Sequence, residues 1–198
     1  MNVAIRRPSM SLEEFLAWEE RQELRHEFDG FAPRAMTRGT RGRSTVKMNL
    51  YRELGTRLTG KPCRPYDSDA KLRMAHTVRY PDAMIVCGPV DRKATWVTEP
   101  VVVFEALSES TSYVDHVEKM QEYTAVSTLK RYVILEQDHI GAVVYARQGD
   151  TWAAKAVTGA AVLEMPEIGV TIPLPDLYQG MDLPSEQPRG DEKPQEIA

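Results

Sequence analysis

The chain has 198 residues, 42% of them hydrophobic and 27% charged, with a formal net charge of −4 at pH 7. This length fits one domain with a real core, and the composition is that of a globular protein rather than a disordered or fibrous one. No run approaches the roughly 20 apolar residues of a membrane span and no apolar run follows Arg6 and Arg7, so we expect a cytoplasmic protein that does not enter membranes.

The N-terminal part predicts a helix, a hairpin and a second helix. The pattern Ser11-Leu12-Glu13-Glu14 is a capping box that starts the first helix. Residues 24–31 alternate loosely around Asp29-Gly30, a typical hairpin turn, with Glu27 just before it. After a loop-like segment at 39–43, Ser44 is expected to cap a second helix that ends near Gly60. Its apolar residues recur about once per turn, at Val46, Leu50, Leu54 and Leu58.

The middle of the chain predicts a mixed sheet. Four short segments rich in Val, Ile and Met read as strands, at residues 70–75, 79–87, 100–107 and 130–135. Residues 108–126 interrupt them as a helix that Ser108 or Ser110 can cap. This helix gives the last strand a crossover of the length that a parallel neighbour requires, so the order is helix, three strands, helix, strand.

The C-terminal part predicts two hairpins and a tail. Residues 141–147 and 152–157 flank Gln148-Gly149-Asp150, and residues 161–165 and 170–172 are joined by Pro166 to Gly169. From residue 184 the chain is rich in Pro, Glu and Gln with little that could be buried. We therefore expect one domain over residues 1–183 and a disordered tail over 184–198.

The two cysteines, Cys63 and Cys87, lack the spacing of a zinc site. We expect them to be reduced thiols in a reducing compartment, without a disulfide or a structural metal.

The charge is unevenly distributed. A net charge of −4 argues against a nucleic-acid partner, yet the segment from Arg34 to Arg64 is strongly basic and contains Glu53 as its one acid. Such a stripe is expected where a protein grips phosphates. The alternative is a solvated helix face with its arginines in water. Between its ends the segment carries Arg38, Arg41, Arg43, Lys47, Arg52, Arg57 and Lys61.

Two acids stand at the ends of predicted buried strands. Asp82 opens the apolar run at 83–87, and Glu105 closes the run at 101–104. Two adjacent carboxylates at strand ends could hold a hard divalent cation, and a lysine beside them adds the positive charge that phosphodiester hydrolysis needs. On the next helix Asp115, Lys119 and Tyr123 are spaced four apart and share a face.

Each feature alone has an ordinary explanation. A strand-end acid is usually solvated, and an Asp–Lys pair at this spacing is usually a surface ion pair. The joint placement of both acids and Lys119 favours a site. A triad hydrolase is disfavoured, because no histidine lies with a Ser or Cys in a nucleophile motif. The histidines are His26, His76, His116 and His139.

With these residues in this order, the chain resembles the Uma2 family, also known as DUF820, whose members resemble restriction endonucleases of the PD-(D/E)xK fold. The resemblance covers about residues 10 to 183 and rests on order and spacing rather than on any one motif. The matching stretches are 26–30, 62–64, 68–73, 80–82, 100–108, 110–111 and 169–175, together with Asp115, Lys119 and Tyr123.

The resemblance implies an α/β fold: a restriction endonuclease-like core with an added N-terminal helix and hairpin and C-terminal β-hairpins. It implies that Asp82 and Glu105 hold Mg²⁺, with Mn²⁺ as a substitute, and that Lys119 positions or deprotonates the attacking water. Leu107 stands where a plain motif has its lysine, so Lys119 is the counterpart. Asp69 matches a further family acid and is a candidate third metal ligand. Glu27 and Tyr123 are candidate supporting residues.

Two departures from the family pattern bear on activity. Arg43 stands where many members have a histidine, and Glu109 replaces the proline of a Ser-Pro-Ser sequence. An arginine can contact phosphate but cannot act as a base near neutral pH. Glu109 adds negative charge that could weaken DNA approach or recruit a further cation.

The resulting hypothesis is a Mg²⁺-dependent endonuclease that acts on DNA as a homodimer. Its expected nucleic-acid contacts are Arg38, Arg41, Arg43 and Lys47. The alternative is an inactive nuclease-fold protein that serves as a nucleic-acid-binding or interaction module. A third reading is a structural protein whose charges form a buried salt-bridge network. Retention of Asp82, Glu105 and Lys119 favours the enzyme, whereas net acidity and Arg43 favour the alternative.

Overall fold

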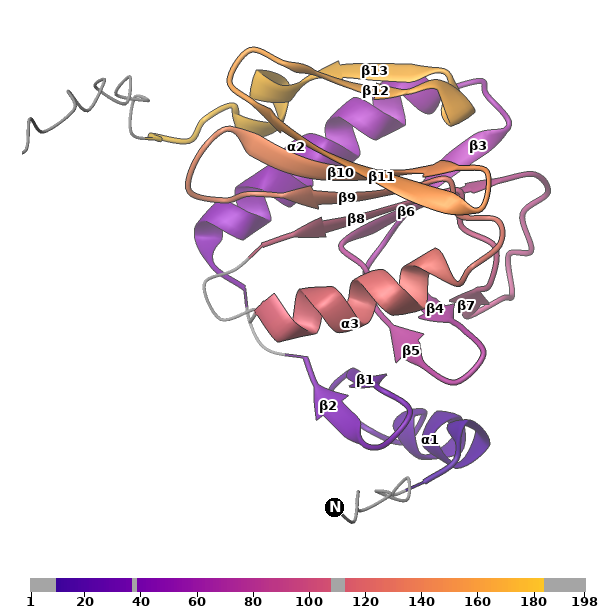
Figure 1. Ribbon diagram of the computed structural model, residues 1–198. Helices are drawn as coiled ribbons and strands as arrows, with labels where there is room; N and C mark the ends of the chain where they lie inside the picture. The colour runs from indigo at the N-terminus through magenta and orange to yellow at the C-terminus, as the bar shows by residue number, and fades with distance from the viewer. Residues whose placement is uncertain (1–9, 37–38, 108–112, 184–198) are drawn as a thin grey trace, which may run out of the picture.

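A six-stranded mixed sheet forms the centre of the protein (Figure 1). The computed structural model describes residues 10–36, 39–107 and 113–183, without the side chains of residues 113–116. The strand order is β11-β10-β9-β8-β6-β3, in which only β8 and β9 are parallel neighbours. The strands are β3 (Cys63–Asp67), β6 (Ala83–Cys87), β8 (Val102–Ala106), β9 (Arg131–Leu135), β10 (Gly141–Gln148) and β11 (Thr151–Thr158).

The predicted order of helix, three strands, helix and strand is present. It appears as α2 (Arg41–Leu58), β3, β6, β8, α3 (Tyr113–Thr124) and β9, and α3 makes the crossover between the parallel strands β8 and β9. The predicted hairpins at 141–157 and 161–172 are also confirmed, as β10 with β11 and as β12 (Val162–Met165) with β13 (Val170–Pro173).

The first core strand was predicted in the wrong place. It is β3, whereas the predicted strand at 70–75 contains only the short β4 (Lys71–Arg73) of another sheet. Pro65 lies in the middle of β3 and breaks the strand pattern, but β3 is at the edge of its sheet, where a proline is tolerated. The predicted strand at 79–87 is likewise interrupted at Pro81 and divides into β5 (Val78–Arg79) and β6.

A second, smaller sheet joins the N-terminal segment to the core. Its order is β2-β1-β5-β4-β7, where β1 is His26–Phe28, β2 is Pro33–Ala35 and β7 is Trp96–Val97. The turn at Asp29-Gly30 is confirmed: Asp29 Oδ1 accepts hydrogen bonds from the N–H groups of Phe31 (2.8 Å) and Ala32 (2.9 Å). Helix α1 (Leu12–Glu19) begins at the predicted capping box of Ser11 and Glu14.

Helix α2 begins before the predicted cap. Its N-cap is Thr40, whose hydroxyl accepts a hydrogen bond from the N–H of Arg43 at 3.1 Å, so residues 41–43 are helical and Ser44 is not the cap. Thr40 can cap because its short side chain reaches the unsatisfied donors of the first turn. The earlier start matters because it places Arg43 and Lys47 one turn apart on one helix face.

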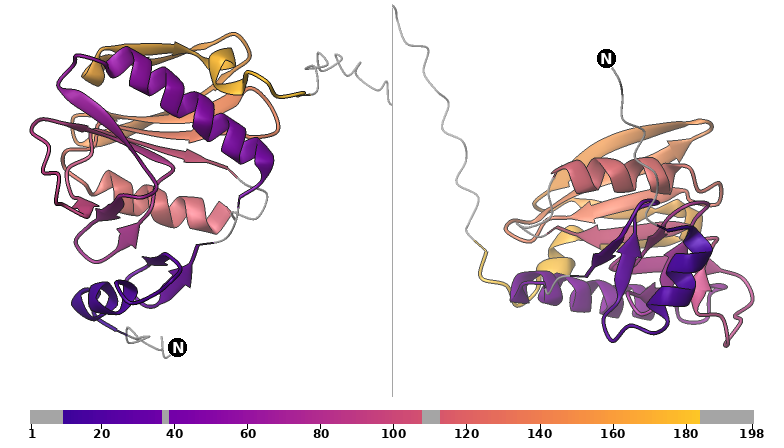
Figure 2. Two further views of the ribbon diagram at one scale, coloured as in Figure 1. Left: turned by 180° about the vertical axis from the view of Figure 1, so that it is seen from behind. Right: turned by 90° about the horizontal axis from the view of Figure 1, so that it is seen from below.

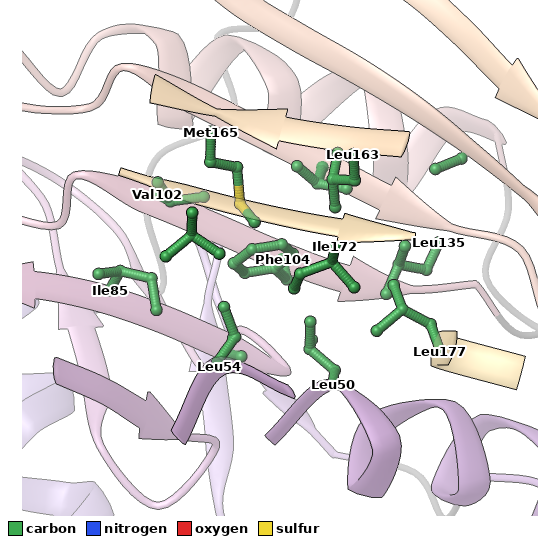
Figure 3. Packing of buried hydrophobic residues seen from close by; sticks show 14 of the residues in the cluster. Leu50, Leu54, Ile85, Val102, Phe104, Leu135, Leu163, Met165, Ile172 and Leu177 are labelled. Carbon is green, nitrogen blue, oxygen red and sulfur yellow. The ribbon is translucent and has the colours of Figure 1, made fainter. Parts of the chain in front are cut away.

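Two hydrophobic layers cover the central sheet (Figures 1 and 2). Helix α2 and the β12–β13 hairpin lie on one face, and α3 lies on the other. In Figure 3, Leu50 and Leu54 of α2 point toward Phe104 and toward Ile172 of the hairpin layer. The predicted core positions Val46, Leu50, Leu54 and Leu58 are all buried.

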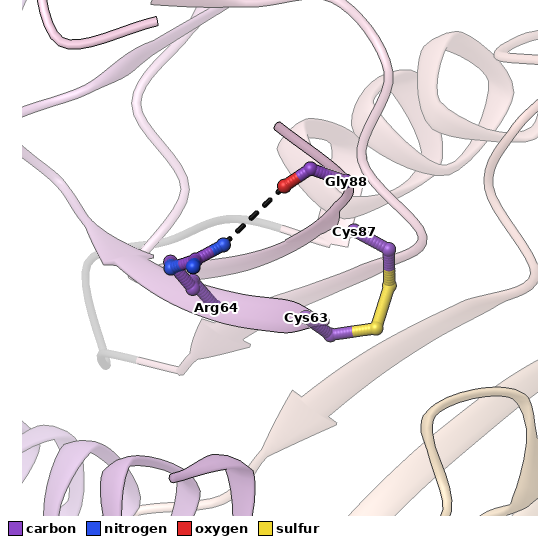
Figure 4. The surroundings of a disulfide bond; sticks show 4 residues. All are labelled: Cys63, Arg64, Cys87 and Gly88. Carbon is purple, nitrogen blue, oxygen red and sulfur yellow. Dashed lines mark hydrogen bonds between the residues drawn. A yellow bond between two sulfur atoms is a disulfide. The ribbon is translucent and has the colours of Figure 1, made fainter. Parts of the chain in front are cut away.

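The prediction of two reduced thiols was wrong, because Cys63 and Cys87 form a disulfide (Figure 4). The two residues are 24 positions apart but face each other directly in the register of β3 and β6. Sequence spacing does not reveal this pairing, since it depends on which strands are neighbours. The bond ties the edge strand to the strand that follows Asp82.

No helix in the described ranges is long and apolar enough to cross a membrane. The predicted disordered tail at 184–198 lies outside the described residues, as do the predicted caps Ser108 and Ser110.

Candidate active site

Asp82 and Glu105 lie at the same end of two neighbouring strands. The antiparallel register of β6 and β8 pairs Ala83 with Phe104, so the next position outward on each strand is Asp82 and Glu105. Both are buried, with exposed fractions of 2% and 4%. The N–H of Ala106 donates to Asp82 Oδ2 at 2.8 Å, which ties the first acid to the strand that carries the second. The structure therefore brings the two predicted acids together.

Helix α2 presents two cations to Asp82. Arg43 donates from Nε to Oδ2 at 3.1 Å and from Nη2 to both carboxylate oxygens at 2.8 Å, while Lys47 Nζ lies 2.9 Å from Oδ1. Tyr51, the next residue at this spacing, donates from its hydroxyl to the backbone carbonyl of Asp82. Positions 43, 47 and 51 lie on one helix face because residues four apart are neighbours on a helix.

Helix α3 presents Lys119 and Tyr123 to Glu105. Lys119 Nζ lies 3.1 Å from Glu105 Oε1, and the hydroxyl of Tyr123 donates to the same oxygen at 2.9 Å. Lys119 is itself buried, with an exposed fraction of 6%. The shared face predicted for Lys119 and Tyr123 therefore points at the second acid. The side chain of Asp115, the third residue of that pattern, is not described.

Glu27 of the N-terminal hairpin extends the cluster. Its Oε1 lies 3.4 Å from Lys119 Nζ and accepts from the N–H of Tyr80 at 3.1 Å, and its Oε2 lies 3.2 Å from Arg79 Nη1. Arg79 has no exposed surface, and it donates to both carboxylate oxygens of Glu122 at 2.7 and 2.6 Å. Negative and positive side chains thus alternate in the order Glu122, Arg79, Glu27, Lys119 and Glu105. This series links the smaller sheet, through α3, to the central sheet and holds the N-terminal segment against the site.

The three acids have different proton affinities. Burial opposes ionisation of Asp82, but the charges of Arg43 and Lys47 outweigh it and lower its pKa. Lys119 and Arg79 do the same for Glu27, lowering its pKa despite burial. Burial raises the pKa of Glu105 to about 6; Lys119 opposes this rise, and the carboxylates of Asp82 and Glu27 reinforce it. Glu105 is therefore the acid of the cluster that takes up a proton most readily.

This difference predicts a pH effect on stability. The folded state holds the Glu105 proton more tightly than the unfolded chain, whose pKa is near 4.5, so the contribution of Glu105 to stability falls as pH rises from about 4.5 to about 6. A difference of about 1.5 pKa units corresponds to a loss of about 2 kcal/mol. Urea unfolding at pH 4.5 to 7 checks this, with Glu105→Gln as the reference that cannot titrate. The prediction would be contradicted if the free energy of unfolding differed between wild type and Glu105→Gln by the same amount at every pH.

Other predicted site residues lie elsewhere. The carboxylate of Asp69 is 72% exposed and forms an ion pair with Arg25 at 2.6 Å, so the structure gives no support to its role as a third metal ligand. Arg41 is exposed at the start of α2. Arg38 and Glu109 lie outside the described residues.

Most of the basic stripe serves the fold rather than an open phosphate-binding face. Arg57 donates to the carbonyl oxygen of Thr171 at 2.8 Å, Lys61 to that of Gly169 at 2.6 Å, and Arg52 to Gln179 Oε1 at 3.0 Å. These bonds attach α2, and Lys61 just after it, to the C-terminal segment. In the described part of the stripe, the cations beside the acid cluster are Arg43 and Lys47, at the N-terminal end of α2.

A second group of potential metal ligands follows β9. Glu136, Asp138 and His139 each offer one ligand atom, and these atoms lie within 4.8 Å of one another, close enough to bind one cation. Asp138 and His139 are exposed and already contact each other at 2.7 Å. This group was not predicted from the sequence, where His139 alone was weighed, as a member of a catalytic triad.

The roles of Arg79 and Tyr51 and the contact of Arg43 and Lys47 with Asp82 were also not predicted from the sequence. The available signal for Arg79 was a charged residue in a segment that otherwise reads as buried. For the others it was spacing: residues 43, 47 and 51 repeat the four-residue interval that was recognised at 115, 119 and 123.

Comparisons with known proteins show what this chain is similar to. A family model described as "Uma2: Putative restriction endonuclease" matches residues 12–175. An uncharacterized protein, slr1290, of Synechocystis sp. (strain PCC 6803) is 31% identical over 178 residues, which are 88% of this chain and 94% of that protein. A crystal structure of a putative nuclease of DUF820 from Anabaena variabilis superposes with a TM-score of 0.73 at 14% identity, covering 85% of this chain and 97% of the other. At that identity the superposition shows a shared fold.

Proposed function

This chain belongs to the Uma2 family, and from that premise we propose that it is a divalent-metal-dependent endonuclease that hydrolyses phosphodiester bonds in DNA. The observation that carries the proposal is the buried cluster in which Asp82 and Glu105 end neighbouring strands and Lys119 contacts Glu105 at 3.1 Å. The order of helix, three strands, helix and strand supports a restriction endonuclease-like core.

The donor set fits Mg²⁺ or Mn²⁺ in ligand type. Asp82 and Glu105 would hold the ion, and both offer carboxylate oxygens, which these hard cations prefer over the sulfur and imidazole ligands typical of zinc. In the described part of the chain, donors reach Glu105 only at Oε1. When bound, the ion supplies Lewis-acid polarisation of the phosphate and a water of lowered pKa.

The protein's own groups would do the positioning. Lys119 is held between Glu105 and Glu27, so its ammonium group is placed to donate to a phosphate oxygen or to orient the attacking water. Tyr123 orients Glu105 through its hydrogen bond. Burial keeps these charges in a low-dielectric surrounding, where their electrostatic effect on the reaction is larger than in water.

The N-terminal end of α2 is the proposed nucleic-acid contact. The side chains of Arg43 and Lys47 are 20% and 22% exposed, and Arg41 is exposed two residues earlier in the helix. Guanidinium and ammonium groups are the usual partners of backbone phosphates. A homodimer, with one site for each strand of a duplex, is part of the same proposal.

A second candidate function rests on the bidentate bond between Arg43 and Asp82. If the guanidinium never leaves the carboxylate, the protein would bind nucleic acid or another partner without cutting it. Within this candidate, the net charge of −4 favours a partner other than nucleic acid.

Incubation of supercoiled plasmid with the purified protein distinguishes the two candidates. We expect nicked or linear DNA with Mg²⁺ or Mn²⁺ and none with EDTA, since the acids alone cannot stabilise a negatively charged phosphate. Salt-dependent DNA binding without cutting in any metal would favour the binding module. Two measurements test the dimer: whether the plasmid product is nicked or linear, and the molecular mass of the protein by light scattering.

A further inference from the structure

Both oxygens of the Asp82 carboxylate already accept hydrogen bonds or ionic contacts from protein donors. Arg43 Nη2 at 2.8 Å and Lys47 Nζ at 2.9 Å contact Oδ1, while Arg43 Nη2 at 2.8 Å, Arg43 Nε at 3.1 Å and the N–H of Ala106 at 2.8 Å reach Oδ2. A carboxylate offers about four lone-pair positions. A divalent cation that used Asp82 as a ligand would therefore have to replace a protein donor.

Only two of these donors can leave without unfolding the site. The N–H of Ala106 belongs to β8, in the middle of the central sheet. Arg43 and Lys47 are long side chains on the first two turns of α2, and each is about one-fifth exposed. Their heads can turn toward solvent while the helix stays in place, so displacement from Asp82 must involve them.

Turning away leaves both cations without a counter-ion. Facing solvent, the two head groups would be hydrated, but they would lose the charge-assisted hydrogen bonds that the buried carboxylate accepts. A backbone phosphate compensates well, because it accepts two parallel bonds from a guanidinium as a carboxylate does. It would also arrive on the solvent side, where both side chains are about one-fifth exposed.

We propose that Arg43 and Lys47 are an internal counter-ion for Asp82 that is transferred to a nucleic-acid phosphate, so that a divalent cation and nucleic acid bind with positive coupling. Without nucleic acid, the two side chains compete with the cation for Asp82. With nucleic acid bound, they pair with phosphate and the carboxylate is released. The inference rests on the proposed function, because it takes Asp82 as the cation's ligand.

Isothermal titration with Mn²⁺ tests the coupling without any measurement of cleavage. The parent protein for all titrations carries Lys119→Met, which is expected to cut slowly and to retain Mn²⁺ binding. It is titrated alone and with a saturating duplex oligonucleotide, the heat of Mn²⁺ binding to DNA alone is subtracted, and a gel confirms that the duplex is intact at the end. We expect DNA to lower the Kd for Mn²⁺ about 10-fold, within the usual range of coupling between two sites.

The Arg43→Ala variant separates this mechanism from direct contact between DNA and the metal. Removing the competitor should tighten Mn²⁺ binding without DNA about 10-fold and reduce the effect of DNA to less than about 3-fold. Lys47→Met should act in the same direction and keeps the test available if Arg43→Ala melts early. Lys155→Ala removes one positive charge from an exposed position of β11, outside the proposed site, and should behave as the parent protein. Asp82→Asn should lose the site.

The outcomes separate the inference from the function. Mn²⁺ binding that requires Asp82, but that neither DNA nor Arg43→Ala alters, would overturn the counter-ion transfer and leave the metal-dependent nuclease intact. Weaker Mn²⁺ binding by a folded Arg43→Ala variant would also overturn it, because Arg43 would then assist the metal. No Asp82-dependent binding under any condition would reject both.

Discussion

Cleavage by the Lys119→Met variant is expected to fall by about 10²- to 10⁴-fold in kcat, the usual loss when a positioned proton-transfer or charge-stabilising group is removed. Lys119 is buried and contacts Glu105 at 3.1 Å and Glu27 at 3.4 Å. Among the described residues, no other cation contacts both of these acids, so none could replace its charge. Methionine keeps most of the length of the side chain and removes its charge. The measurement is the initial rate of plasmid nicking in Mg²⁺ at saturating DNA.

Two comparisons make this result specific. Lys155→Met removes an exposed lysine of β11 and should cut at the wild-type rate. Glu105→Gln should lose cleavage to a similar extent, but it should also weaken Mn²⁺ binding, whereas Lys119→Met should retain it. Cleavage by a folded Lys119→Met variant at more than about one-tenth of the wild-type rate would show that the ammonium group is not used, since group removal of this kind costs at least about 10².

Arg79→Met is expected to lower the free energy of unfolding by about 3–5 kcal/mol, the usual cost of removing one partner from a buried ion pair. Arg79 has no exposed surface and donates to Glu122 twice and to Glu27 once. Methionine leaves both carboxylates without that partner. The loss is measured by urea unfolding at pH 7, followed by circular dichroism.

Paired variants test the electrostatic origin of this cost. Arg79→Met combined with Glu122→Leu removes both charges and should recover part of the loss, because an apolar pair does not leave an unpaired buried charge. Arg64→Met, at an exposed arginine of β3 that donates to the carbonyl oxygen of Gly88, should change stability by about 0.5 kcal/mol or less. If Arg79→Met were no more damaging than Arg64→Met, the network would not support the fold.

Much of the site could be predicted from local patterns. Asp82 and Glu105 were predicted as candidates because each begins or ends an apolar run. Such runs become strands, and the ends of neighbouring strands lie close together. Lys119 and Tyr123 were found because residues four apart share a helix face. Their partners could not be found this way. Spacing shows that residues 43, 47 and 51 share a face, but it does not show which strand that face covers.

Two errors have one physical origin. The strand β3 was missed because Pro65 disfavours a strand locally, although an edge position removes the penalty. The disulfide was missed because 24 residues separate two cysteines that strand pairing places opposite each other. Each depends on which elements are neighbours.

By itself, then, the sequence determined the helices α1 to α3, most of the strands of the central sheet, the buried positions of α2 and the chemistry available at two strand ends and one helix face. These follow from local backbone preferences and from hydrophobic periodicity, which act over a few residues. The tertiary structure alone decided that Arg43 and Lys47 neutralise Asp82, that Glu27 reaches Lys119 and that Arg79 is buried between two acids. Those contacts join residues 35 to 92 positions apart, and charges interact through space rather than along the chain.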